Sequence, residues 1–272
     1  MENETLGFIG AGNMASSLIR GLIAKGINPK SILVADLDSE KLHNLSSESG
    51  IQASDNQEIA ESADVIVLAV KPQVMKDVCS NIKVGDHSPL VVSVAAGISI
   101  EHIESWLGSD TAVTRCMPNT PALVGKGASG LFANSKTTDE QRSLAANLME
   151  AVGISVWVEK EEAIDTVTAL SGSGPAYFFL FIEAMQEAAK ELGLAEDIAK
   201  RLSIQTALGA AELALQSTED VAELRRQVTS PGGTTEQALN VFESEDLRSL
   251  VSKALKAAHD RSAELAKEFG DT

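Results

Sequence analysis

Short apolar runs alternate with helical patterns along the first half of the chain. The runs at residues 6–9, 31–35, 65–70 and 90–94 are rich in Val, Ile and Leu and predict buried strands. Between the first two runs, Met14, Leu18 and Leu22 lie on one side of a predicted helix. This alternation indicates parallel strands covered by helices on both faces, a doubly wound α/β arrangement. Further strands are expected at the far edge of the sheet, at residues 111–116, 128–133 and 154–158.

Strand patterns stop at about residue 161, and helical patterns continue to the end of the chain. Helices are predicted at residues 177–192, 195–215, 235–242 and 247–269. We therefore expect two domains, an α/β domain at residues 1–160 and an all-helical domain at residues 161–272. The helical part carries so much apolar surface that a second subunit is expected to complete it.

Composition narrows the class of partner. The chain has 39 Asp and Glu against 22 Lys and Arg, a formal net charge of −17, which disfavours nucleic acid. The longest apolar stretch, residues 176–185, is too short to span a membrane. The two cysteines suit a reducing compartment, and the N-terminus lacks the pattern of a secretion signal. We expect a cytoplasmic protein without a metal site, because its four histidines lie outside every motif.

A glycine-rich loop follows the first predicted strand. Gly10, Gly12 and Ala15 fit the Gly-x-Gly-x-x-Gly/Ala fingerprint of a Rossmann-type dinucleotide site, although this spacing alone also occurs in ordinary turns. Asp36 ends the second strand, where a carboxylate binds the ribose hydroxyl of NAD and repels the 2′-phosphate of NADP. The residues therefore favour NADH over NADPH. Two alternatives stay open: Asp36 caps the next helix, or Lys41 reaches a phosphate.

Other predicted strands end in loops at the same edge of the sheet, where ligands of such folds bind. Each loop alone is typical of an ordinary turn. The hypothesis that they bind a ligand rests on the position that they share. The expected cofactor-binding residues are Gly10, Gly12, Asn13, Met14, Asp36, Ala69, Val70, Lys71, Pro72, Ala96, Gly97 and Asn119.

A second glycine-rich loop, residues 230–235, precedes a predicted helix. Free N–H groups at a helix start favour bound anions, so Ser230, Thr234 and Thr235 are candidates to bind a carboxylate. Thr234 and Gln237 also fit a capping box, which is compatible with the anion site. A further loop at residues 171–177 begins the helical half and contains Ser173; a plain helix start explains it equally well.

The positions after that loop separate two classes of enzyme. β-Hydroxyacid dehydrogenases have a similar two-domain plan and carry a Lys and an Asn in the first helix of the second domain. Phe178 and Ile182 occupy the matching positions here, so the lysine is absent and proton transfer to or from an alcohol has no evident agent. Reduction of an imine does not require such an acid–base residue, because solvent or a hydroxyl group can supply the proton to its nitrogen.

Five segments together resemble the pyrroline-5-carboxylate reductase family: FIGAGNM at 8–14, AVKP at 69–72, MPNTP at 117–121, SGSGPAY at 171–177 and TSPGGTT at 229–235. The resemblance runs from about residue 5 to residue 268. It implies reduction of 1-pyrroline-5-carboxylate to L-proline with NADH or NADPH, the last step of proline biosynthesis. It also implies an intertwined dimer through the helical domain, and decamers in many members.

The resemblance assigns roles to particular residues. It implies that Ser230, Gly233, Thr234 and Thr235, with Ser173, bind the substrate, and that the Thr235 hydroxyl faces the ring nitrogen as the catalytic group. One departure concerns the cofactor. The family commonly has Ser, Thr or Asn after the second strand, often beside Arg, and prefers NADPH, whereas this chain has Asp36 and Leu37. The alternatives are a β-hydroxyacid dehydrogenase and a regulator that binds nucleotide without turnover.

Overall fold

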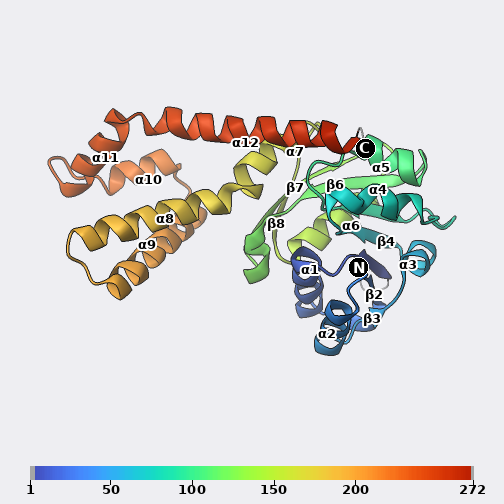
Figure 1. The fold of residues 1–272 in the computed structure, drawn as a ribbon. Coiled ribbons are helices and arrows are strands. Elements are labelled where there is room, and N and C mark those ends of the chain that lie inside the picture. The colour runs from blue at the N-terminus through green and yellow to red at the C-terminus, as the bar shows by residue number, and fades with distance from the viewer. Residues whose placement is uncertain (1–3, 271–272) are drawn as a thin grey trace. The chain divides into compact units, whose positions relative to one another are not determined.

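The computed structural model describes residues 4–270 and divides the chain into two compact units. The first, which we call the sheet unit, extends to Ser173 and takes in the chain again from Ala257. The second, the helical unit, covers Gly174–Lys256. Each is described by itself below (Figure 1).

The sheet unit contains, among the described residues, an 8-stranded sheet with the order β3-β2-β1-β4-β5-β6-β7-β8. Neighbouring strands are parallel except β6 and β7, which are antiparallel. The predicted doubly wound α/β fold is thus confirmed. The strands are β1 (Leu6–Ile9), β2 (Ile32–Ala35), β3 (Gln52–Ala53), β4 (Val65–Leu68), β5 (Leu90–Ser93), β6 (Ala112–Met117), β7 (Gly127–Ala133) and β8 (Gly153–Trp157).

Two apolar cores lie on the two faces of the sheet. Successive side chains of a strand point to opposite faces, so Phe8 enters one core and Ile9 the other. Val67 and Ile66 of β4 divide in the same way. All four residues of β1, β4 and β5 are buried, which explains why these strands are continuous apolar runs.

Helices cover both faces, and their first residues explain where they begin. The side chains of Asp38, Asp55, Ser99 and Thr138 accept backbone N–H groups at the starts of α2, α3, α5 and α6. The helices and 3₁₀ turns up to residue 150 are α1 (Asn13–Ala24), η1 (Pro29–Ser31), α2 (Ser39–Ser49), α3 (Asn56–Ser62), α4 (Pro72–Ser80), α5 (Ile100–Leu107), η2 (Thr120–Val124) and α6 (Asp139–Glu150).

A short helical segment after β8 explains where the sheet unit ends. It consists of α7 (Ala163–Val167) and a π-helical turn, η3 (Thr168–Gly172), which the sequence pattern did not predict. Ile164 and Ala169 are buried in the sheet unit, so this segment belongs to it. The division into compact units therefore differs from the expected domains 1–160 and 161–272.

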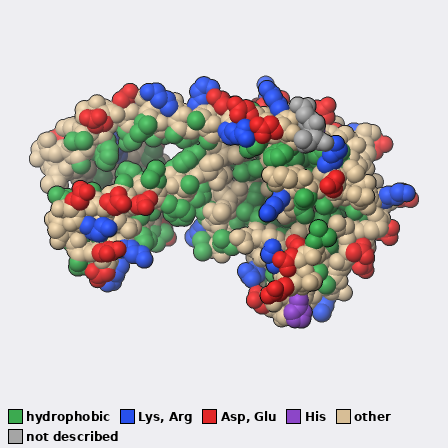
Figure 2. Space-filling model, viewed as in Figure 1, with side chains coloured by type: hydrophobic (Ala, Val, Ile, Leu, Met, Phe, Trp, Pro, Cys, Tyr) green, Lys and Arg blue, Asp and Glu red, His purple; other side chains and the backbone are tan. Residues whose placement is uncertain are grey.

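The helical unit is built from α8 (Gly174–Glu191), α9 (Glu196–Gln216), α10 (Val221–Gln227), α11 (Thr234–Ser244) and the first part of α12 (Leu247–Gly270). Many of its large apolar side chains are exposed; Phe178 and Phe179 are 69% and 66% exposed. Figure 2 shows hydrophobic side chains over the surface of this unit. So much exposed apolar surface is typical of a contact region between proteins. Within residues 4–270, no helix is long and apolar enough to cross a membrane.

Candidate active site

The strands of the sheet unit end in register at one edge. Ala35, Ile9, Leu68 and Ser93 are paired across β2, β1, β4 and β5, and Arg115 of β6 continues the row. The residues that follow this row are therefore neighbours along the carboxyl edge. The strand order reverses between β1 and β4, which is where doubly wound sheets bind their ligands.

The loop after β1 has the geometry of a phosphate cradle. Gly10 has φ +107°, and a Cβ on it would lie 2.7 Å from the carbonyl oxygen of Ala69, so this loop and the loop after β4 touch. A Cβ on Gly12 would meet no atom within 4 Å, so the backbone there is open to a ligand. Ala15 is fully buried, which lets α1 lie against the sheet. Gly10 and Gly12 of the predicted cofactor site thus lie in one loop whose backbone is open at Gly12.

The Asp36 carboxylate accepts two backbone N–H groups, one in the loop after β1 and one in the loop after β2. Its Oδ2 accepts the N–H of Ala11 at 2.6 Å, and its Oδ1 accepts the N–H of Asp38 at 2.8 Å. The alternative that Asp36 caps the next helix is wrong, because Asp38 caps α2 by accepting the N–H of Lys41. This backbone hydrogen bond is the main reason why the pKa of Asp38 lies below its ordinary value. A hydrogen bond from the Lys41 side chain lowers it further.

A polar hollow of about 410 Å³ lies beside the glycine loop, between α1 and α2. Its basic side chains already have acidic partners: Arg20 lies 2.8 Å from Glu48, and Lys41 lies 3.2 Å from Asp38. The sequence did not indicate this hollow, because its lining comes from two helices. It is lined by Ala11, Gly12, Asn13, Ser16, Arg20, Lys41, Asn44, Leu45 and Glu48.

The loops after β5 and β6 complete the edge. Gly97 turns the β5 loop with φ +74°. Asn119 is buried, and its side chain donates to the carbonyl oxygen of Ser171 at 2.9 Å and accepts the N–H of Ala128 at 2.9 Å. The Asn119 amide therefore joins the β6 loop to the turn η3 and to β7. Sequence patterns indicated Asn119 but not these partners.

Cys116 lies near the end of β6, close in sequence to the expected site. Its thiol is buried, and burial raises its pKa far above the ordinary value. Cys79 on α4 is also buried, and burial raises its pKa to about 12. Both thiols are protonated near neutral pH, so neither is a nucleophile or a thiolate ligand.

The second glycine-rich loop belongs to the helical unit. Gly232 has φ +71°, and Gly233 is the N-cap of α11. The predicted capping box is wrong: Thr234 lies inside the helix, and no side chain caps it. Because the helix begins there, the N–H groups of Thr234 and Thr235 have no acceptor within it. Both threonines and Ser230 are exposed.

A carboxylate is already part of this loop. Glu236, in the first turn of α11, accepts the N–H of Gly232 through Oε2 at 2.8 Å. It holds the turn at Gly232 and places a negative charge beside the exposed N–H groups. The sequence contained a signal for this contact, because Glu three residues after an N-cap often bonds back to the preceding backbone.

The fold and the strand-end loops define a class, the oxidoreductases that bind a nicotinamide nucleotide in a doubly wound sheet and carry a helical second part. Comparison with known proteins gives the family. Residues 161–265 match a family model described as pyrroline-5-carboxylate reductase dimerisation, and residues 5–97 match one described as NADP oxidoreductase coenzyme F420-dependent.

Curated relatives match over the whole chain. The chain is 50% identical to a pyrroline-5-carboxylate reductase of Pseudomonas aeruginosa over 272 residues, covering 99% of this chain and 100% of the relative. A relative from Vibrio alginolyticus with the same name is 43% identical, with the same coverage of both chains. The chain belongs to the pyrroline-5-carboxylate reductase family, as its motifs predicted, and is an oxidoreductase.

Solved structures agree with the fold. A pyrroline-5-carboxylate reductase from Coxiella burnetii has a TM-score of 0.92 at 47% identity, covering 97% of this chain and 98% of that chain. A pyrroline carboxylate reductase from Plasmodium falciparum with NADP bound has a TM-score of 0.86 at 32% identity, covering 98% and 99%. The match to a dimerisation model supports a homo-oligomer. The exposed apolar side chains of the helical unit are available for subunit contacts.

Proposed function

We propose that the protein reduces 1-pyrroline-5-carboxylate to L-proline with a reduced nicotinamide nucleotide. The observation that carries this conclusion is 50% identity over essentially the whole length to a curated enzyme of that name. The missing lysine at Phe178 agrees with it, because a C=N bond needs no strong protein acid. A β-hydroxyacid dehydrogenase and a regulator without turnover are not supported by any of these relatives.

The loop before α11 is the proposed carboxylate site. The N–H groups of Thr234 and Thr235 lie at the positive end of the helix dipole and would donate to the substrate carboxylate, together with the Ser230 hydroxyl. Gly233 leaves the backbone accessible, and Ser173 would line the site at the end of η3. The Thr235 hydroxyl would donate a hydrogen bond to the ring nitrogen, keeping the imine carbon in position for reduction.

The strand-end loops are the proposed cofactor site. A bound nicotinamide nucleotide supplies the hydride. Gly10, Gly12, Asn13 and Met14 would hold its pyrophosphate at the start of α1, where N–H groups have no helical acceptor. The remaining expected residues, Ala69, Val70, Lys71, Pro72, Ala96, Gly97 and Asn119, would form or support the nicotinamide side.

NADH is the proposed physiological cofactor. Asp36 places a carboxylate where a 2′-phosphate would lie, and two like charges repel. The nearby Lys41 and Arg20 each lie beside an acidic group, which offsets part of their attraction for that phosphate. The expected assembly is a dimer through the helical unit, with dimers forming decamers, in the cytoplasm.

Steady-state kinetics test the function. The purified protein is expected to oxidise NADH or NADPH only when pyrroline-5-carboxylate is added, with L-proline as the product. No oxidation with either nucleotide would contradict the proposal.

Thr235→Ala tests the assigned site. Loss of the hydroxyl should lower kcat at least about tenfold, while the Kd of the reduced nucleotide stays near the wild-type value. Ser244→Ala is the matched control, since it removes a hydroxyl at the other end of α11. Equal activity of Thr235→Ala and Ser244→Ala would remove the catalytic role of Thr235.

A further inference from the structure

The last turns of α12 lie against the loop that follows β5. A Cβ on Gly97 would lie 3.1 Å from Cδ2 of Phe269 and 3.3 Å from Cβ of Leu265. The Phe269 ring also packs against the core that contains Ala95 and Ile98. All of these residues belong to the sheet unit, so this contact lies within one compact body.

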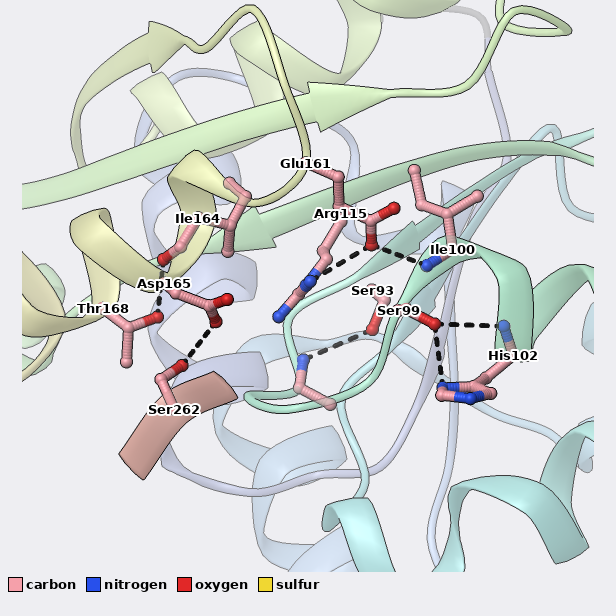
Figure 3. A network of polar contacts seen from close by, with 11 residues as sticks. Ser93, Ser99, Ile100, His102, Arg115, Glu161, Ile164, Asp165, Thr168 and Ser262 are labelled. Atoms are coloured by element: carbon pink, nitrogen blue, oxygen red, sulfur yellow. Dashed lines mark hydrogen bonds and ion pairs between the residues drawn. The ribbon is translucent and has the colours of Figure 1, made fainter. Parts of the chain in front are cut away.

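A part-buried hydrogen bond holds the same part of α12. The Ser262 hydroxyl donates to Oδ1 of Asp165 on α7 at 2.7 Å, and Ser262 is only 4% exposed (Figure 3). Ser262, Leu265 and Phe269 are spaced by three and four residues, so they lie on one face of the helix. This face is therefore docked at two points, one polar and one apolar.

The far end of the β5 loop is held by a separate ion pair. Glu161 lies 3.1 Å from the buried Arg115 guanidinium, and the same Oε1 accepts the N–H of Ile100 at 2.8 Å at the start of α5 (Figure 3). At the near end, the Ser93 hydroxyl accepts the N–H of Ala95 at 3.4 Å. Both ends of the loop are tied, and Gly97 between them is covered by α12.

We propose that the C-terminal turns of α12 position the β5 loop for cofactor binding, with Phe269 as the positioning residue. This inference rests on the assignment of Ala96 and Gly97 to the cofactor site. Gly97 has no side chain, so it contributes no side-chain packing that would hold this left-handed turn in place. The ring of Phe269 and the side chain of Leu265 supply a wall against it, which lowers the cost of ordering the loop when nucleotide binds.

Phe269→Ala tests the proposal by direct titration of NADH and NADPH, without imino acid, on the full-length protein. The Kd of the better-binding nucleotide should rise about tenfold, because the loop must then be ordered at the expense of binding energy. At saturating nucleotide, the KM for pyrroline-5-carboxylate should change less than about twofold. Because no imino acid is present in the titration, a wrong substrate assignment leaves this result unaffected.

Two further variants separate positioning from general stability. Lys267→Ala changes an exposed residue of the same helical turn and should leave the Kd at the wild-type value. Phe269→Leu keeps an apolar side chain, so the helix stays docked, and it should raise the Kd about threefold. A wild-type Kd in folded Phe269→Leu and Phe269→Ala would overturn the proposal. If Phe269→Ala does not fold, a wild-type Kd in Phe269→Leu alone would do so.

Discussion

Asp36 at the end of β2 accepts the N–H of Ala11 in the glycine loop at 2.6 Å. The residue that discriminates between the two nucleotides in our proposal thus also holds the loop that would bind their pyrophosphate. A carboxylate has further lone pairs, so this bond leaves acceptor capacity for a ribose hydroxyl.

Replacing Asp36 should change the preference between nucleotides. Asp36→Ser removes the charge that repels a 2′-phosphate, so kcat/KM for NADPH relative to NADH should rise at least about tenfold, equivalent to about 1.4 kcal/mol. Asp36→Asn also removes the charge but keeps an oxygen that can accept the Ala11 N–H. Comparing the two variants separates the effect of the charge from the effect of the loop contact. A wild-type enzyme with higher kcat/KM for NADPH would refute the assignment of Asp36.

Glu236 should weaken substrate binding through its charge. Glu236→Gln keeps an oxygen that can accept the Gly232 N–H and removes the negative charge near the proposed carboxylate site. The KM for pyrroline-5-carboxylate should fall about threefold, and more at low salt, because screening weakens charge repulsion. Glu245→Gln, at the other end of α11, is the matched control. An equal effect of both variants would indicate net charge rather than a local contact.

Buried thiols should make the protein lose stability at alkaline pH. The folded-state pKa of Cys79 is about 12, above its ordinary value of 9.0, so its contribution is complete below pH 9.0 and lost as pH rises toward 12. In that window the free energy of unfolding should fall by about 1.4 kcal/mol per pH unit for each buried thiol. Denaturant unfolding with a reductant measures this slope. Cys79→Ala should reduce it, and an unchanged slope would exclude Cys79 as its source.

A charge on the exposed face of α8 should disrupt the assembly. Phe179 is 66% exposed in the single chain, and burying an aspartate in an apolar subunit contact is costly. Phe179→Asp should therefore shift the sedimentation coefficient to that of a smaller species. Leu37→Asp changes an exposed apolar residue outside the helical unit and should leave the assembly intact. Intact assembly in Phe179→Asp would place Phe179 outside the contact.

The sequence predicted those features that depend on local patterns. Buried strands such as β4 are continuous apolar runs. The glycine loop after β1 has the spacing of glycines that a tight turn between a strand and a helix requires. The start of α11 was predicted within one residue. The N-cap residue was predicted wrongly, as Thr234 instead of Gly233, because both Thr and Gly are common N-cap residues. The turn η3 was missed, because a π-helical turn has no apolar period of its own.

Contacts between distant segments could not be predicted in this way. Gly97 and Asn119 were selected as ends of strands, but their partners Phe269 and Ser171 lie far along the chain. Apolar periodicity indicates which face of a helix is buried and not what buries it. The contact of α12 with the β5 loop therefore required the structure.

The helix α12 runs without interruption through 24 residues, about 36 Å at 1.5 Å per residue. Its first turns belong to the unit in which we expect the subunit contacts, and its last turns lie against the β5 loop. We expect this continuous helix to couple subunit assembly to nucleotide binding. Any factor by which assembly tightens nucleotide binding is the factor by which bound nucleotide tightens assembly.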